Sequence, residues 1–72
     1  MSVGKFIELS GQSSDSYEDA IRQAVQRASS TIRNIRSVWA KEFEAEVQGN
    51  NVTQFRVIVK IAFVLDEGAS AS

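Results

Sequence analysis

The sequence predicts a small α+β domain with the element order strand, helix, strand, strand (β-α-β-β). Residues 55–65 carry an apolar side chain at every odd position, which is the pattern of a strand with one buried face. Residues 17–35 carry apolar side chains at steps of three and four, which is the stripe of an amphipathic helix. The polar bend at residues 48–51 (Gln-Gly-Asn-Asn) suits a hairpin turn, because glycine and asparagine tolerate positive φ angles.

The first strand is expected over residues 2–10. Its side chains alternate, so that Ile7 and Leu9 lie on one face of the strand and Phe6 lies on the other. Residues 10–14 (Ser-Gly-Gln-Ser-Ser) are polar and contain a glycine, and they predict a loop before the helix.

The helix is expected over residues 16–35. Two overlapping capping boxes mark its beginning, one pairing Asp15 with Glu18 and the other pairing Ser16 with Asp19. Acidic side chains in this first turn also suit the positive end of the helix dipole. Three alanines make the apolar stripe narrow, which allows the helix to lie close to a sheet.

The second strand is expected over residues 37–48 and the third over residues 52–66, while residues 67–72 form a small polar tail that we expect to be frayed. Strict alternation predicts that one face of the second strand carries Trp39, Lys41, Phe43, Ala45 and Val47. The opposite face then carries a row of glutamates, Glu42, Glu44 and Glu46.

The connections predict the order of the strands in the sheet. A helical crossover makes the first and second strands parallel, and the hairpin makes the third strand antiparallel to the second. With the third strand in the centre, every neighbouring pair is antiparallel. We therefore expect a three-stranded antiparallel sheet wrapped over one helix.

The third strand is apolar on both faces, since half of its even positions are apolar as well. The helix covers one face, and a chain of 72 residues has little left to cover the other. A core of this size supplies only about 3–5 kcal/mol, so small domains commonly add disulfides, a metal or oligomerisation. Because the chain has no cysteine, we expect the single domain of residues 1–72 to assemble with copies of itself.

The composition excludes several classes of function. The chain has no cysteine and no histidine, so it lacks thiolate metal ligands and the commonest general base, and no enzymatic role is expected. A formal charge of −1 argues against nucleic-acid binding. No apolar run approaches the ~20 residues of a membrane span, and no signal-peptide region is present, which favours a cytoplasmic protein without a membrane partner.

Trp39 and a few polar residues are the candidate binding groups. Trp39 offers either a subunit contact or a stacking platform for a flat aromatic ligand. Arg56 and Gln54 share the non-core face of the third strand, where they offer ion pairs or hydrogen bonds to the edge of a ring. The row of glutamates fits either a solvated edge strand or a hard cation such as Ca²⁺.

Three stretches of the chain resemble the dodecins, and the similarity runs from Lys5 to Asp66. They are residues 9–21 (Leu-Ser-Gly-Gln-Ser-Ser-Asp-Ser-Tyr-Glu-Asp-Ala-Ile), 28–32 (Ala-Ser-Ser-Thr-Ile) and 61–66 (Ile-Ala-Phe-Val-Leu-Asp). The resemblance implies a β-α-β-β chain that assembles into a hollow dodecamer and binds flavins. In that family, tryptophans of symmetry-related subunits sandwich the flavin rings, and a glutamine on the last strand hydrogen-bonds the ring edge.

For this chain the resemblance implies a protein that stores, buffers or quenches a flavin (riboflavin or FMN). Counted without gaps, the tryptophan of the family falls on Ser37, two residues before Trp39 and on the same face of the strand. The glutamine of the family falls on Arg56, one same-face step from Gln54. The predicted flavin site therefore consists of Trp39, Arg56, Gln54, Ser37, Val38 and Lys41. The alternative is a dodecin-like shell that binds divalent metal ions or another ligand without flavin.

Overall fold

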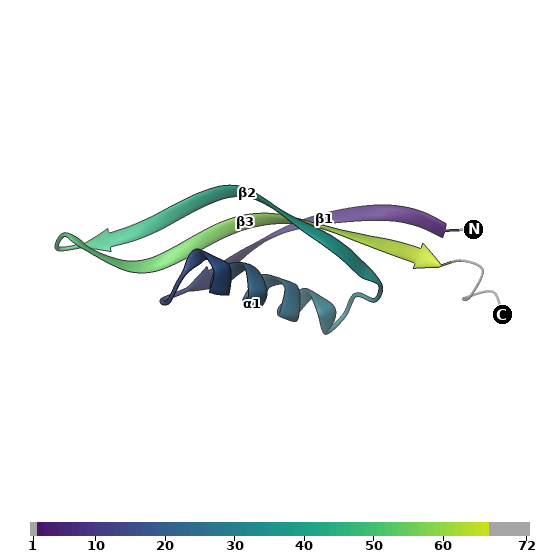
Figure 1. Ribbon diagram of the computed structural model, residues 1–72, viewed down its shortest axis with the longest axis horizontal. Coiled ribbons are helices and arrows are strands. Elements are labelled where there is room, and N and C mark those ends of the chain that lie inside the picture. The colour runs from purple at the N-terminus through teal and green to yellow at the C-terminus, as the bar shows by residue number, and fades with distance from the viewer. Residues whose placement is uncertain (1, 67–72) are drawn as a thin grey trace.

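The structure is a computed structural model that describes residues 2–66. Its elements are β1 (Ser2–Ser13), α1 (Tyr17–Ser29), β2 (Ile35–Gln48) and β3 (Asn51–Asp66), as Figure 1 shows. Both strand pairs are antiparallel, and the order in the sheet is β1-β3-β2. The predicted β-α-β-β order and the central third strand are confirmed. The predicted frayed tail, residues 67–72, lies outside the described residues.

The first strand is longer than the sequence pattern predicts. Its pairing with β3 continues through the expected polar loop, to Gly11 opposite Val57 and Ser13 opposite Phe55. The prediction of a loop over residues 10–14 is therefore wrong for most of that stretch. The physical reason is that β3 offers a long row of backbone partners, which outweighs the low strand propensity of serine and glycine.

The helix ends at Ser29, six residues before the predicted end. The N–H groups of Ser30 and Thr31 donate to the carbonyls of Arg27 and Ala28, three residues back, so the last turn tightens as the helix ends. Asn34, at a φ of 61°, then turns the chain into β2. Ile32, in the connection after the helix, and Ile35, the first residue of β2, nevertheless pack against the core. These apolar contacts explain why the helical stripe in the sequence extends past the helix itself.

The helix begins with the second of the two predicted capping registers. Ser16 is the N-cap, and its hydroxyl accepts a hydrogen bond from the N–H of Asp19 at 3.0 Å. The carboxylate of Asp19 accepts from the hydroxyl of the buried Ser13 at 2.6 Å and from the amide of Gln23 at 2.8 Å. These hydrogen bonds lower the pKa of Asp19 below its ordinary value, so its charged form ties β1 to α1.

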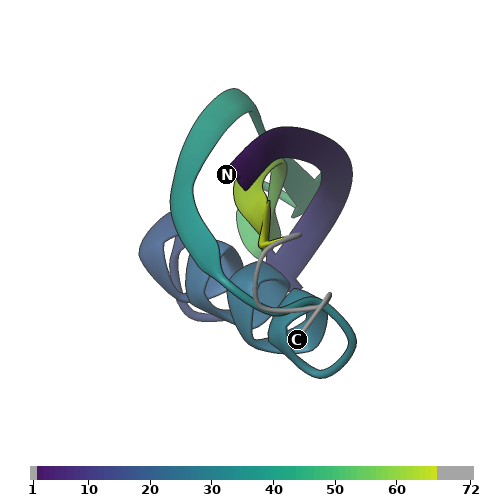
Figure 2. The same cartoon turned by 90° about the vertical axis from the view of Figure 1, so that its right-hand side faces the viewer.

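The core lies between α1 and one face of the sheet. Three helix alanines face three β3 side chains, and all six are at most 6% exposed: Ala20, Ala24, Ala28, Val57, Val59 and Ile61. Figure 2 shows the sheet curving over the helix. The alanines keep the two layers close, and Gly11 takes part in the same close approach. A Cβ atom at Gly11 would lie 2.1 Å from the carbonyl oxygen of Ala20.

The hairpin of β2 and β3 projects beyond the helix (Figure 1), and the described residues extend over 56 Å in their longest direction. Tyr17, at the first turn of α1, packs edge-on against Phe43 and Phe55, with ring centroids 5.2 and 4.9 Å away. Farther along the hairpin, Val47 and Val52 pair with each other and are more than half exposed. The helix-side face of the sheet is therefore covered in its middle and open at the hairpin.

Candidate functional site

A β-bulge in β2 decides which side chains share the face of the sheet away from α1. Ala40 pairs with the buried Val59, whereas Glu42 pairs with Ile58, so Lys41 is an extra residue between them. From Ser37 to Ala40 the even positions of β2 face the helix, and beyond Lys41 the odd positions do. The prediction that Trp39 and Phe43 share a face is therefore wrong, because strict alternation does not survive the bulge.

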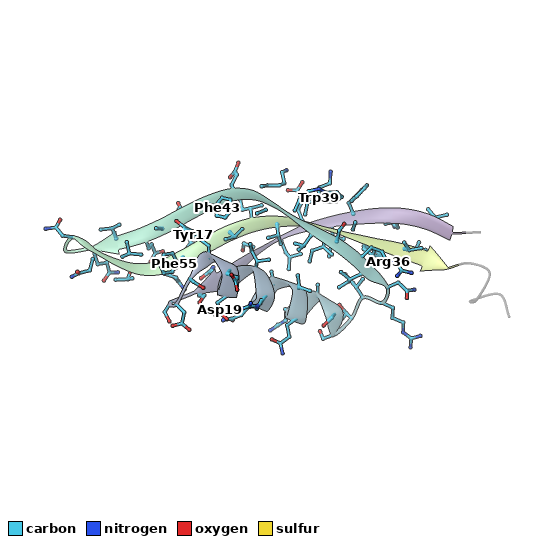
Figure 3. The ribbon with its side chains drawn as sticks, viewed as in Figure 1. Tyr17, Asp19, Arg36, Trp39, Phe43 and Phe55 are labelled. Carbon is cyan, nitrogen blue, oxygen red and sulfur yellow. The ribbon has the colours of Figure 1, made fainter. Side chains whose placement is uncertain are left out.

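We call the face of the sheet away from α1 the outer face. The register with β3 assigns to it the even positions of β3 from Gln54 to Val64. From β1 it takes Phe6 and Glu8, and from β2 it takes Ser37, Trp39, Glu42, Glu44 and Glu46. Figure 3 shows Trp39 on this side of the sheet, opposite the helix.

The first feature of the outer face is a group of two rings and an ammonium, Phe6, Trp39 and Lys60, which we call the aromatic patch. The ring centroids of Phe6 and Trp39 lie 5.7 Å apart, and about half of each side chain is exposed. Lys60 Nζ lies 4.6 Å from the Phe6 centroid and 5.9 Å from the Trp39 centroid. Beside the patch, Lys41 Nζ donates to Glu8 Oε2 at 2.9 Å across the central strand.

The second feature is a charged group nearer the hairpin. The guanidinium of Arg56 donates to Glu44 through Nη1 and to Glu46 through Nη2, the latter at 2.8 Å. These hydrogen bonds, first that of Glu46 and then that of Glu44, raise the pKa of Arg56 above its already high value. A recess of about 300 Å³ adjoins the group, and its lining includes Glu42, Ile58 and Arg56.

The fold has counterparts among known proteins. The family model described as Dodecin matches residues 3–66, which is nearly the whole chain. The chain belongs to the dodecin family. A curated dodecin of Thermus thermophilus is 32% identical over 65 residues, covering 90% of this chain and 94% of that protein.

Solved structures agree with this assignment. The crystal structure of a Thermus thermophilus protein, tt0972, superposes with a TM-score of 0.86 at 30% identity, covering 92% of this chain and 97% of that one. The calcium dodecin of Mycobacterium tuberculosis, described as calcium-chelating with a novel calcium-binding site, gives a TM-score of 0.76 at 31% identity. That match covers 85% of this chain and 87% of the mycobacterial chain. One relative of this fold is therefore described by a metal ion that it binds.

Within this dodecin chain the six predicted site residues form two groups. Ser37 and Trp39 lie on the outer face opposite Ala62 and Lys60, and Lys41 reaches the same region through Glu8. Val38 pairs with the buried Ile61 and packs against the core, so its side chain points away from the outer face.

The other two predicted residues lie toward the hairpin. Arg56 and Gln54 are four and six residues along β3 from Lys60, the partner of Trp39, which corresponds to about 13 and 20 Å of extended strand. A single copy of the dodecin chain therefore does not bring them to a ring stacked on Trp39. Both arms of the Arg56 guanidinium are already engaged by glutamates.

Phe6 and Lys60 were not among the predicted site residues. The sequence does place both on the non-core faces of their strands, but only the register of β1 and β2 against β3 brings them to Trp39. Among residues 2–66, no three acidic side chains are grouped so that they could hold a metal ion. No helix in that range is long and apolar enough to cross a membrane.

Proposed function

We propose that the protein is a non-enzymatic, self-assembling dodecin that binds a flavin, riboflavin or FMN, on Trp39. The observation that carries this proposal is the half-exposed indole of Trp39 on the outer face, next to the ring of Phe6. An exposed indole offers a flat π-surface, and stacking on such a surface is worth about 1–3 kcal/mol per ring. Family membership supports the choice of a small flat ligand.

The proposal includes a second subunit in the site. Trp39 and the pair Arg56 and Gln54 are too far apart on one chain to hold the same ring, so any contribution of the latter comes from a neighbouring copy. We expect a homododecamer in which copies of Trp39 from symmetry-related subunits close over the ligand. The role we propose is storage, buffering or photoprotective quenching of the flavin, since an indole stacked on the ring can quench its excited state.

A fluorescence titration tests the proposal. Riboflavin and FMN emission should fall on addition of the native protein at micromolar concentration, and Trp39→Ala should abolish most of that quenching. Phe43→Ala is the matched control, because Phe43 is exposed to a similar extent, 56% against 49%, but lies on the opposite face of the sheet. Light scattering should show that both variants keep the native mass. Unquenched emission with the native protein would rule out the flavin function.

The second candidate is a flavin-free dodecin that binds a divalent cation on the row of glutamates. The observation in its favour is that Glu42, Glu44 and Glu46 share the outer face, and a related dodecin is described as calcium-chelating. Two observations oppose this function. Within residues 2–66 the three carboxylates are not grouped so that they could hold a metal ion, and the Arg56 guanidinium already pairs with Glu44 and Glu46. If this candidate is right, Ca²⁺ raises the melting temperature, EDTA reverses the rise, and riboflavin has no effect.

A further inference from the structure

Lys60 occupies an unusual electrostatic position on the outer face. It pairs in register with Glu8 on one side and with Trp39 on the other. The carboxylate of Glu8, however, is taken by Lys41 at 2.9 Å. Among the ion pairs within residues 2–66, none includes Lys60, and its ammonium lies over the two rings of the aromatic patch instead.

Within the part of the chain that the structure describes, this arrangement gives the aromatic patch a positive charge without a carboxylate partner. An aromatic face attracts a cation much more weakly than a carboxylate does. The ammonium of Lys60 therefore keeps most of its capacity to bind an anion. Lys41, beside the patch, is paired with Glu8, so Lys60 is the group of the patch that distinguishes a charged ligand from a neutral one. A molecule stacked on Trp39 would carry its substituents within reach of this ammonium.

We infer that Lys60 makes the aromatic patch selective for ligands that join a flat aromatic ring to an anionic group, such as a phosphate or a sulfonate. This inference rests on the proposed function for the role of Trp39 as stacking surface, but it does not require that the ring be a flavin. If the ligand is a flavin, the preferred form is FMN, because its phosphate adds the negative charge that riboflavin lacks.

Two pairs of probes test the charge preference. FMN and riboflavin share one ring system and differ in the phosphate, while anilinonaphthalene sulfonate and N-phenylnaphthylamine form an equivalent dye pair differing in the sulfonate. Trp39 is the only tryptophan of the chain, so changes in its emission report on ligands bound at or near this site. We expect the anionic member of each pair to bind about fivefold more tightly, as for a partly exposed ion pair.

The variant Lys60→Gln should remove this preference and bring each affinity ratio close to one. Lys5→Gln is the matched control, because it removes the same charge from the opposite face of β1 and should leave the ratios unchanged. The preference should also shrink between low and high concentrations of sodium chloride, because salt screens exposed charges.

The outcomes separate this inference from the flavin proposal. Dye discrimination that depends on Lys60, with no flavin binding, would support the anionic selectivity and refute the flavin function. Flavin binding with equal affinities for FMN and riboflavin, or a preference that persists in Lys60→Gln, would refute the selectivity and leave the flavin function standing. Failure of all four probes to bind would refute both.

Discussion

At the scale of single residues, Gly11 sets how closely the helix approaches the sheet. The buried alanines of α1 leave no space for an additional methyl group, and a Cβ at Gly11 would overlap the carbonyl of Ala20 at 2.1 Å and touch Ala24 at 3.0 Å. The obstacle is backbone of a packed helix, which cannot move aside as the end of a long side chain can. The closeness of the two layers therefore depends on this glycine.

We expect Gly11→Ala to lower the free energy of unfolding by about 1–3 kcal/mol or more, the usual cost of overpacking a core. Gly4→Ala is the control, because a Cβ at Gly4 meets nothing within 4 Å, and it should change stability by less than about 0.5 kcal/mol. Urea denaturation followed by circular dichroism measures both. Equal stability of the two variants would show that the helix and the sheet lie farther apart at Gly11 than the 2.1 Å contact implies.

At the scale of elements, the bulge at Lys41 determines the chemistry of the outer face. It lets β2 send Val38 and Ala40 toward the helix before the bulge and Phe43 and Ala45 toward the helix after it. Trp39 and the glutamate row thereby come to lie together on the outer face. The sequence carries a signal of this bulge, because the small and apolar positions change from even to odd numbers across Lys41.

Deletion of Lys41 should be far more damaging than its substitution. Without the extra residue, one half of β2 must turn over, which either buries Trp39 or places the glutamates on the helix side. We expect the free energy of unfolding to fall by more than about 2 kcal/mol, because part of β2 then turns its apolar side chains outward or its charged side chains toward the helix.

Lys41→Ala is the control for this deletion. It keeps the bulge and loses only the exposed pair with Glu8, for which we expect a change of about 0–1 kcal/mol. Guanidinium denaturation measures both variants. Similar stability of the deletion and the substitution would mean that β2 accepts either register.

At the scale of the whole molecule, the chain exposes apolar surface at both ends of the sheet. The aromatic patch occupies the outer face, and Val47 and Val52, which pair with each other near the hairpin turn, are more than half exposed. A small domain with so thin a core gains stability by covering such surface with further copies of itself. The hairpin therefore belongs, in our proposal, to the contacts between subunits.

Light scattering should give a native mass of about twelve times the 7.9 kDa of the chain, as we expect for a dodecin. Val52→Asp should shift the protein to smaller species, because an apolar contact cannot accept an uncompensated charge. Gln48→Asp, at the end of the same strand pair, is the control and should keep the native mass. A native monomer would refute the assembly, and an unchanged mass of Val52→Asp would exclude the hairpin from the subunit contacts.

The sequence alone determined the element order, the central position of β3 and its buried row Val57, Val59 and Ile61. These features follow from periodicity within one segment, which is a local property of the chain. It also singled out Trp39 as a candidate stacking residue, since the chain contains one tryptophan only.

The tertiary structure decided which groups surround Trp39 and which do not. Phe6, Lys60 and Trp39 come from three different strands, and their meeting depends on the register between strands, including the bulge at Lys41. Backbone pairing and side-chain packing fix that register together, and a single extra residue exchanges the two faces of a strand. Local periodicity contains no such information, so the neighbours of Trp39 followed only from the assembled sheet.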